Sequence, residues 1–200
     1  MPSHPLILAS GSAVRARLLK AAGITFTQEP ARVDEETLKD GLVAEKARPH
    51  QIADALAELK AVRVSQKYPQ AHVIGCDQIL WCGEQLYSKP RDMAEARQAL
   101  LALRGRTHSL YSAVCVALGG SVLWRYFSQP KLTMRDFSEA FLDDYLEKAG
   151  EAVLSSVGAY QLEGLGSQLF SRVEGDYFSI LGLPLLPLQD VLRQHRTLIP

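Results

Sequence analysis

The run HVIGCDQILWC, residues 72–82, constrains the fold of this chain more than any other stretch. Its residues are almost all apolar, which predicts a buried strand, and one acid, Asp77, interrupts it. An unpaired carboxylate is costly to bury, so such groups are normally paired, bound to a metal or neutralised. A nearby Lys or Arg could satisfy Asp77 for purely structural reasons, and a role in a functional site is the alternative.

Strand and helix patterns alternate along the rest of the chain. Residues 6–9 predict a short buried strand, and a Ser-Gly-Ser turn at 10–12 precedes a helix that Gly23 ends. We expect that helix to bury Val14, Leu18, Ala21 and Ala22, and a second helix, over 50–66, to bury Ile52, Leu56, Leu59 and Val62. The remaining expected elements are a strand over 24–29, a polar loop with some helix over 30–50, a helix over 93–103 capped by Asp92 and Glu95, a hairpin over 109–127 turning at Gly119-Gly120, a strand over 131–137 and a helix after Ser138.

This mixture of elements predicts an α/β fold in which a mixed sheet is flanked by helices. The 200 residues suit one domain, spanning 1–200, that buries about 70% of the surface of the unfolded chain. No clear linker divides the sequence. Residues 128–138 are the expected seam if the domain has two lobes.

Composition excludes several classes of partner. Twenty-two basic side chains balance twenty-two acidic ones, so no overall field attracts a nucleic acid polymer or an anionic membrane, and any anion site must be local. Cys76, Cys82 and Cys115 form no CxxC pair and favour reduced core cysteines in a cytoplasmic protein. Residues 1–11 predict no signal peptide, and no apolar run approaches the ~20 residues of a membrane span.

The turn at residues 10–12 raises a question about charge. Arg15 and Arg17 stand in the first turns of the predicted helix, where the helix dipole disfavours each cation by roughly 0.3–1 kcal/mol. Ser10, Ser12 and free backbone N–H groups at a helix N-terminus can bind phosphate, which would give the arginines an anionic partner. The alternative is a serine cap followed by a solvated helix face. If Arg15 serves only phosphate, Arg15→Ala should leave the ligand-free protein equally stable or slightly more stable.

Several other side chains are candidates only in combination. Asp34, Glu35 and Glu36 form an acidic run, and one of them could join Asp77 around Mg²⁺, which prefers carboxylates and substrate phosphates. Lys60 borders an apolar helix face, Lys89 sits in a turn after a strand, and each could equally be a plain surface lysine. The five histidines form no metal-binding set, and His72 and His108 are expected to pack at strand ends.

Taken together, these stretches resemble the Maf family of nucleoside triphosphate pyrophosphatases almost from end to end. LILASGSAVRARLL resembles its opening phosphate loop, PARVDEE its acidic segment and LAELKA its lysine helix. VIGCDQI matches its Gly-x-Asp-[Thr/Gln] strand, and SKPRDMAEARQALLALRGRTHSLYS resembles the segment that follows. GAYQLEGLG and VEGDYFSILGLPL match its closing motifs.

The resemblance implies a fold shared with inosine triphosphate pyrophosphatases, two lobes around a central cleft, and a cytoplasmic homodimer. It also implies a hydrolase that uses Mg²⁺ or Mn²⁺ to convert a nucleoside triphosphate into the monophosphate and pyrophosphate. By position, Asp77 and Glu35 resemble the catalytic and metal-binding acids. The matching phosphate contacts are Ser10, Ser12, Arg15, Lys60 and Lys89.

Three positions that resemble the family's substrate-sorting residues are Val14, Gln78 and Glu163. Gln and Glu resemble the branch acting on 7-methyl-GTP rather than the branch acting on dTTP and UTP, so a guanine-type base is expected. The chain also departs from the family pattern, because Ala13 and Val14 replace a proline and a basic or aromatic residue, Ala16 follows Arg15, and SSVG (155–158) lacks a lysine. Arg17 could supply the missing charge. A nucleotidyltransferase and a non-catalytic nucleotide-sensing regulator of cell division remain as alternatives.

Overall fold

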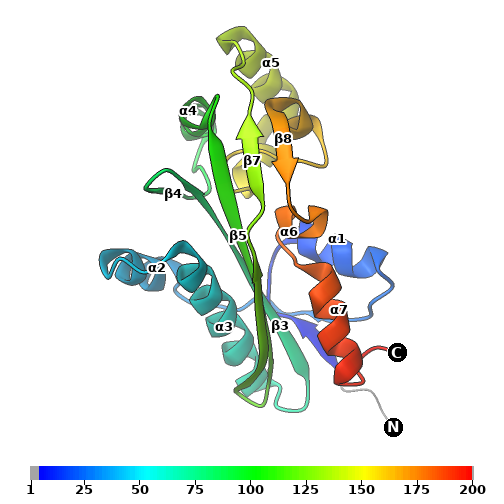
Figure 1. Ribbon diagram of the computed structural model, residues 1–200. Coiled ribbons are helices and arrows are strands. Elements are labelled where there is room, and N and C mark those ends of the chain that lie inside the picture. The colour runs from blue at the N-terminus through cyan, green and yellow to red at the C-terminus, as the bar shows by residue number, and fades with distance from the viewer. Residues whose placement is uncertain (1–4, 200) are drawn as a thin grey trace.

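Two long antiparallel strands, β3 (His72–Cys82) and β5 (Thr107–Leu118), form the spine of the molecule (Figure 1). The computed structural model describes residues 5–199. One sheet of eight strands has the order β2-β1-β3-β5-β7-β8, with β4 paired to β3 and β6 paired to β5. Strand β1 runs parallel to β2 and β3, whereas the other pairs are antiparallel. The predicted mixed α/β architecture is therefore confirmed.

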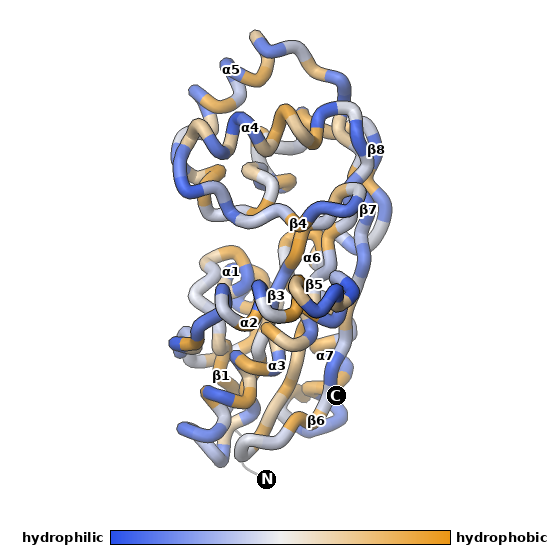
Figure 2. The backbone as a smooth tube through the Cα atoms, turned by 90° about the vertical axis from the view of Figure 1, so that its left-hand side faces the viewer, coloured by the Kyte–Doolittle hydropathy of each residue, from blue (hydrophilic) through white to orange (hydrophobic). Residues whose placement is uncertain are grey.

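Helices cover both faces of the sheet in its lower half (Figure 1). Helix α3 (Pro49–Lys67) packs on one face, and α1 (Ala13–Ala21) and α7 (Leu185–Gln194) pack on the other. Helices α4 (Met93–Leu103) and α5 (Glu139–Ala149) lie in the upper half with a core of their own. Figure 2 shows the two halves joined by the long strands. The remaining elements are β1 (Leu6–Leu8), β2 (Thr27–Gln28), α2 (Glu35–Ala44), β4 (Gln85–Tyr87), β6 (Ser121–Ser128), β7 (Lys131–Met134), β8 (Phe170–Glu174), α6 (Tyr177–Ile180) and the 3₁₀ segments η1 (Gly150–Ser155) and η2 (Leu165–Leu169).

The predicted caps and turns are present at their residues. The hydroxyl of Ser12 accepts a hydrogen bond from the backbone N–H of Arg15, and Ser138 caps α5 in the same way. Asp92 caps α4, although the Glu95 carboxylate accepts from the N–H of Arg91 rather than closing the box on Asp92. Both hairpin glycines, 119 and 120, have positive φ, as the tight turn between β5 and β6 requires.

Two of the predicted helix faces are confirmed only in part, because Leu18, Ile52 and Leu56 are buried but the other predicted residues are not. In α1 the buried residues are Ala16, Leu18 and Leu19, so Val14 is free to face a cleft. In α3 the buried face is shifted to a set that contains many alanines and one lysine, Lys60, while Leu59 and Val62 are only partly buried. The strand predicted over 24–29 is present only as β2.

Gly75 explains the shifted face of α3. A Cβ atom at Gly75 would lie 2.1 Å from the carbonyl oxygen of Ala57 and 2.6 Å from the backbone nitrogen of Ala61. The backbones of α3 and β3 therefore touch, which only small residues on both elements permit. This close approach brings the Lys60 side chain against the part of β3 that carries Asp77.

Other predictions have mixed outcomes. The three cysteines are buried and form no disulfide, and His72 and His108 are buried at the beginnings of β3 and β5. The seam predicted at 128–138, which includes β7, stays a prediction. Within residues 5–199, no helix has the length and apolar character needed to cross a membrane. The absence of a signal peptide was predicted from a stretch whose first four residues, with His4, lie outside the described chain.

Candidate active site

A cleft of about 880 Å³ opens between the two halves of the molecule. Its walls come from the turn before α1, the start of α2, one face of α3, the middle of β3, the segment after β4 and residues 155–163. The ten site residues that the family resemblance implies all line it: Ser10, Ser12, Val14, Arg15, Glu35, Lys60, Asp77, Gln78, Lys89 and Glu163. The fold thus brings together side chains that are distant in the sequence.

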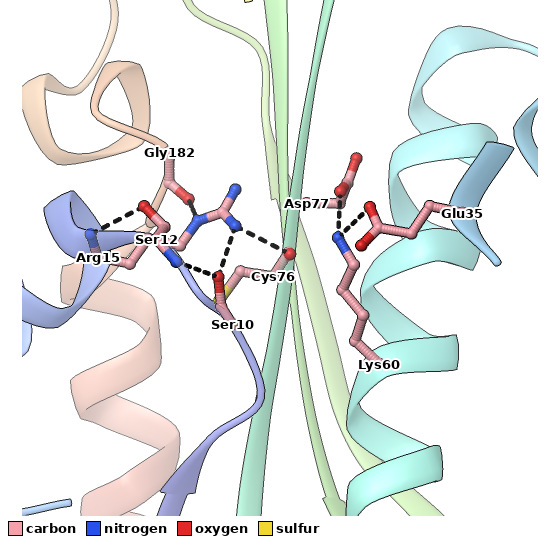
Figure 3. Close-up of polar contacts among 8 residues, drawn as sticks. All are labelled: Ser10, Ser12, Arg15, Glu35, Lys60, Cys76, Asp77 and Gly182. Atoms are coloured by element: carbon pink, nitrogen blue, oxygen red, sulfur yellow. Dashed lines mark hydrogen bonds and ion pairs between the residues drawn. The ribbon is translucent and has the colours of Figure 1, made fainter. Parts of the chain in front are cut away.

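Lys60 joins the two candidate catalytic acids. Its ammonium nitrogen lies 2.7 Å from Oδ1 of Asp77 and 2.7 Å from Oε2 of Glu35 (Figure 3). Lys60 and Asp77 are 7% and 9% exposed, whereas the Glu35 side chain is about half exposed. A lysine therefore does pair with Asp77, which is one of the two alternatives that the sequence left open. The pair nevertheless faces the cleft.

The three acids at the start of α2 make different contacts. Asp34 caps the helix by accepting a hydrogen bond from the N–H of Thr37, and Glu35, the first helical residue, reaches Lys60. Glu36 also lines the cleft. Asp34 is therefore the helix cap, and Glu35 is the acid of this run that pairs with Lys60.

Burial raises the pKa of Asp77 above its ordinary value of 3.8, although the neighbouring cations Lys60 and Arg15 oppose that shift. A carboxylate in this setting holds its proton more strongly than one in water. Lys89 stands at the exposed edge of the cleft, where desolvation and the like charges of Arg15 and Lys60 lower its pKa. Arg15, Lys60 and Lys89 thus place three cations around the cleft, beside the carboxylates of Asp77 and Glu35.

Arg15 is tied into the fold as well as into the cleft. Its Nε donates to the carbonyl oxygen of Gly182 at 2.8 Å, and its Nη1 donates to the Ser10 hydroxyl and to the carbonyl oxygen of Cys76, each at 3.1 Å (Figure 3). These bonds give the guanidinium three acceptors within the chain. We therefore expect Arg15→Ala to destabilise the protein rather than leave its stability unchanged, because three acceptors would lose their donor.

The three substrate-sorting positions lie on different walls. The Gln78 side-chain nitrogen donates to the Ser112 hydroxyl and to the carbonyl oxygens of Ser179 and Ile180. Glu163 accepts from Arg17 of α1 across the cleft, with Arg17 Nη2 2.8 Å from Glu163 Oε1. Sequence reasoning missed the roles of Ser112 and Gly182, since no local pattern marks a hydroxyl or a carbonyl that serves a residue far along the chain.

The donor set suits a hard cation only in part. Glu35 and Asp77 supply two carboxylates, and among residues 5–199 no group of three or more His, Cys, Asp or Glu side chains could hold a metal ion. Mg²⁺ is commonly bound by one or two carboxylates together with substrate phosphates. The two acids therefore fit a metal whose remaining ligands come from a phosphorylated substrate.

Comparison with known proteins agrees with this geometry. The sequence profile of the family described as Maf-like protein matches residues 5–195. A protein of Paramagnetospirillum magneticum named nucleoside triphosphate pyrophosphatase is 58% identical over 97% of this chain and 100% of its own length. One of the same name from Granulibacter bethesdensis is 53% identical over 96% of this chain and 98% of its own. A Brucella abortus protein named 7-methyl-GTP pyrophosphatase is 49% identical over 96% of both chains.

Proposed function

This chain belongs to the Maf-like protein family, and we propose that it is a hydrolase that splits a nucleoside triphosphate into the monophosphate and pyrophosphate. The observation that carries the proposal is the Lys60 ammonium bridging Asp77 and Glu35 in a cleft whose opposite wall is a serine-rich turn before a helix. That arrangement places a candidate base opposite donors for phosphate. The names of the relatives agree with it.

Asp77 is the proton acceptor of the proposed reaction. Its carboxylate orients a water molecule and takes its proton while the water oxygen bonds to the α-phosphorus. The bond from the α-phosphorus to the bridging oxygen breaks, and pyrophosphate leaves with the electron pair. Lys60 favours the charged form of the Asp77 carboxylate and so opposes the effect of burial, since the ammonium stabilises the anion in a nearly buried position.

Phosphate is held by the opposite wall. Ser10, Ser12 and the first N–H groups of α1 present donors, and the Nη2 group of Arg15 has no hydrogen-bond partner among the described residues. Lys89 at the cleft edge is a further cation. Fixing the triphosphate in line with the water supplies much of the rate, because positioning removes entropy from the barrier.

A divalent cation, Mg²⁺ or Mn²⁺, would be held by Glu35 and Asp77 together with phosphate oxygens, and it would neutralise the charge that develops on those oxygens. The homodimer that the family resemblance implies and the cytoplasmic location that the cysteines favour stay predictions.

For the base, we propose a guanine type over dTTP and UTP, with only a modest gain from methylation. The Glu163 carboxylate can accept from the two kinds of N–H group on the Watson–Crick edge of guanine, whereas thymine and uracil offer one. Leaving such a carboxylate unmatched is costly, which is how a site rejects the wrong base. Val14 lacks an aromatic face to stack on a cationic methylated purine. The Brucella relative's name agrees with a guanine-type substrate.

The test is kcat/KM for GTP, 7-methyl-GTP, dTTP and UTP with Mg²⁺, in the wild type and in Glu163→Gln. The wild type should rank both guanine substrates first, and the variant should lose that ranking. A preference of the wild type for the pyrimidines, or an unchanged ranking in the variant, would show that Glu163 does not read the base. A nucleotidyltransferase would release pyrophosphate only with a second substrate, and a nucleotide-sensing regulator would bind without turnover.

A further inference from the structure

The contact between Arg17 and Glu163 joins the two halves of the molecule at the cleft. Arg17 belongs to α1, which packs in the lower core, whereas Glu163 lies between Tyr160 and η2, which pack in the upper core. The two residues are 146 positions apart in the sequence, and both line the cleft.

The two partners differ in their exposure. The Arg17 side chain is 60% exposed, whereas that of Glu163 is only 18% exposed. Oxygen Oε1 of Glu163 accepts from Arg17, and Oε2 has no hydrogen-bond partner among the described residues. Glu163 lines the cleft, so this second oxygen is open to an N–H donor of a ligand.

Arg17 also has donors to spare and a position beside a substrate-sorting residue. A guanidinium carries five N–H donors in a rigid fork, and here only one Nη2 bond is formed. Val14 and Arg17 are three residues apart on α1, so their side chains are neighbours on one helix face, and both line the cleft. The helix dipole disfavours a cation this close to the N-terminus, and Glu163 offsets that penalty.

We propose that Arg17 is a further specificity-determining residue, which holds Glu163 and, with it, presents a hydrogen-bond donor beside an acceptor to the base. The inference rests on the proposed function, in which Glu163 reads the base. An adjacent donor and acceptor match the edge of guanine, where O6 accepts and N1–H and the 2-amino group donate. Adenine presents a donor and an acceptor in the opposite order, so both contacts are mismatched.

An ordinary surface ion pair would not discriminate between guanine and adenine. Exposed pairs contribute little to stability and are indifferent to the ligand. If the pair only clasps the two halves together, any arrangement that restores opposite charges will serve. If it reads the base, the order of donor and acceptor matters.

The experiment measures binding, so that it does not depend on turnover. Dissociation constants are determined by calorimetry for GTP and ATP analogues in which a methylene group replaces the bridging oxygen between the α- and β-phosphorus atoms. The wild type should bind the GTP analogue at least about tenfold more tightly, and Arg17→Met should lose most of that ratio, since each contact is a hydrogen bond to a charged group. Arg97→Met, which removes a surface arginine paired with Glu139 and Asp143 outside the cleft, is the matched control and should keep the ratio.

The double variant Arg17→Glu/Glu163→Arg distinguishes recognition of the base from an ion pair that only joins the two halves of the molecule. Its melting temperature should stay close to that of the wild type, but it should not regain the preference for the guanine analogue. Equal affinities in the wild type, an unchanged ratio in Arg17→Met, or a preference restored by the double variant would each overturn the inference. Failure of the proposed function would instead appear as binding without pyrophosphate release from GTP.

Discussion

The Lys60 ammonium lies 2.7 Å from Oδ1 of Asp77, in a pair of side chains that the fold almost completely buries. The same ammonium lies 2.7 Å from Oε2 of Glu35. One lysine thus holds the two acids of the cleft together in the ligand-free protein. The first two predictions follow from this relationship.

Asp77→Asn should lower kcat by at least about a hundredfold, in the range seen when a general base is removed. The variant should still fold, because the amide has nearly the same size and Lys60 retains Glu35. Steady-state kinetics and circular dichroism measure the two effects. Asp54→Asn is a suitable control. Asp54, on α3, is a partly buried acid like Asp77, but it does not line the cleft. Turnover near the wild-type rate in Asp77→Asn would exclude the mechanism.

The pH profile should carry the signature of the Lys60–Asp77 pair. Burial raises the pKa of Asp77, and activity requires the carboxylate, so activity should fall as the pH drops through that raised value, above the ordinary 3.8. Lys60→Met removes a cation that opposes the raised pKa of Asp77, so the acid limb of log kcat should move to higher pH. The maximal kcat should also be lower. Lys67→Met, which removes an exposed lysine of the same helix, should not move the limb. An acid limb at the same pH in Lys60→Met would refute the coupling.

Arg15→Ala should destabilise the ligand-free protein by about 1–3 kcal/mol, because the carbonyl oxygens of Gly182 and Cys76 lose a charged donor. Arg17→Ala, which removes a mostly exposed arginine of the same helix, should change the stability much less. Urea unfolding of both variants measures the difference. Equal stability of Arg15→Ala and the wild type would return Arg15 to a role in phosphate binding alone.

Gly75→Ala should damage fold and site together. The added methyl group would meet the backbone of α3 at 2.1 Å, so the helix must move away from β3 and carry Lys60 with it. Overpacking of this kind typically costs 1–3 kcal/mol or more, and kcat should fall although no cleft residue is replaced. Gly41→Ala in α2, where a Cβ atom meets nothing within 4 Å, should be neutral or slightly stabilising. Wild-type melting temperature and kcat in Gly75→Ala would contradict this explanation of the site.

The sequence predicts the elements of this fold better than it predicts their faces. Strand β3 begins and ends at the expected residues, and the caps at Ser12, Asp92 and Ser138 form, because these signals are local. The buried face of α3 was predicted from its largest apolar residues, whereas the observed face is set by contact with Gly75. No periodicity within the helix reveals a glycine on a strand that packs against it.

The site shows the same division. The ten residues that the family resemblance implies lie in one cleft. The sequence does not say which of them contact one another, since contacts between side chains depend on long-range packing. The resemblance implies that Lys60 contacts phosphate, whereas in the structure its ammonium bridges Glu35 and Asp77. The bonds from Arg15 to Gly182 and from Arg17 to Glu163 link positions more than 140 residues apart, which local sequence patterns do not encode.

The central claim is that water attacks the α-phosphorus from the side of Asp77 and expels pyrophosphate. The most direct test is hydrolysis of GTP with Mg²⁺ in ¹⁸O-labelled water, followed by mass spectrometry of the products. The account predicts the monophosphate and pyrophosphate in equal amounts, with the label in the monophosphate alone. Label in the pyrophosphate, or release of the diphosphate and inorganic phosphate, would contradict it.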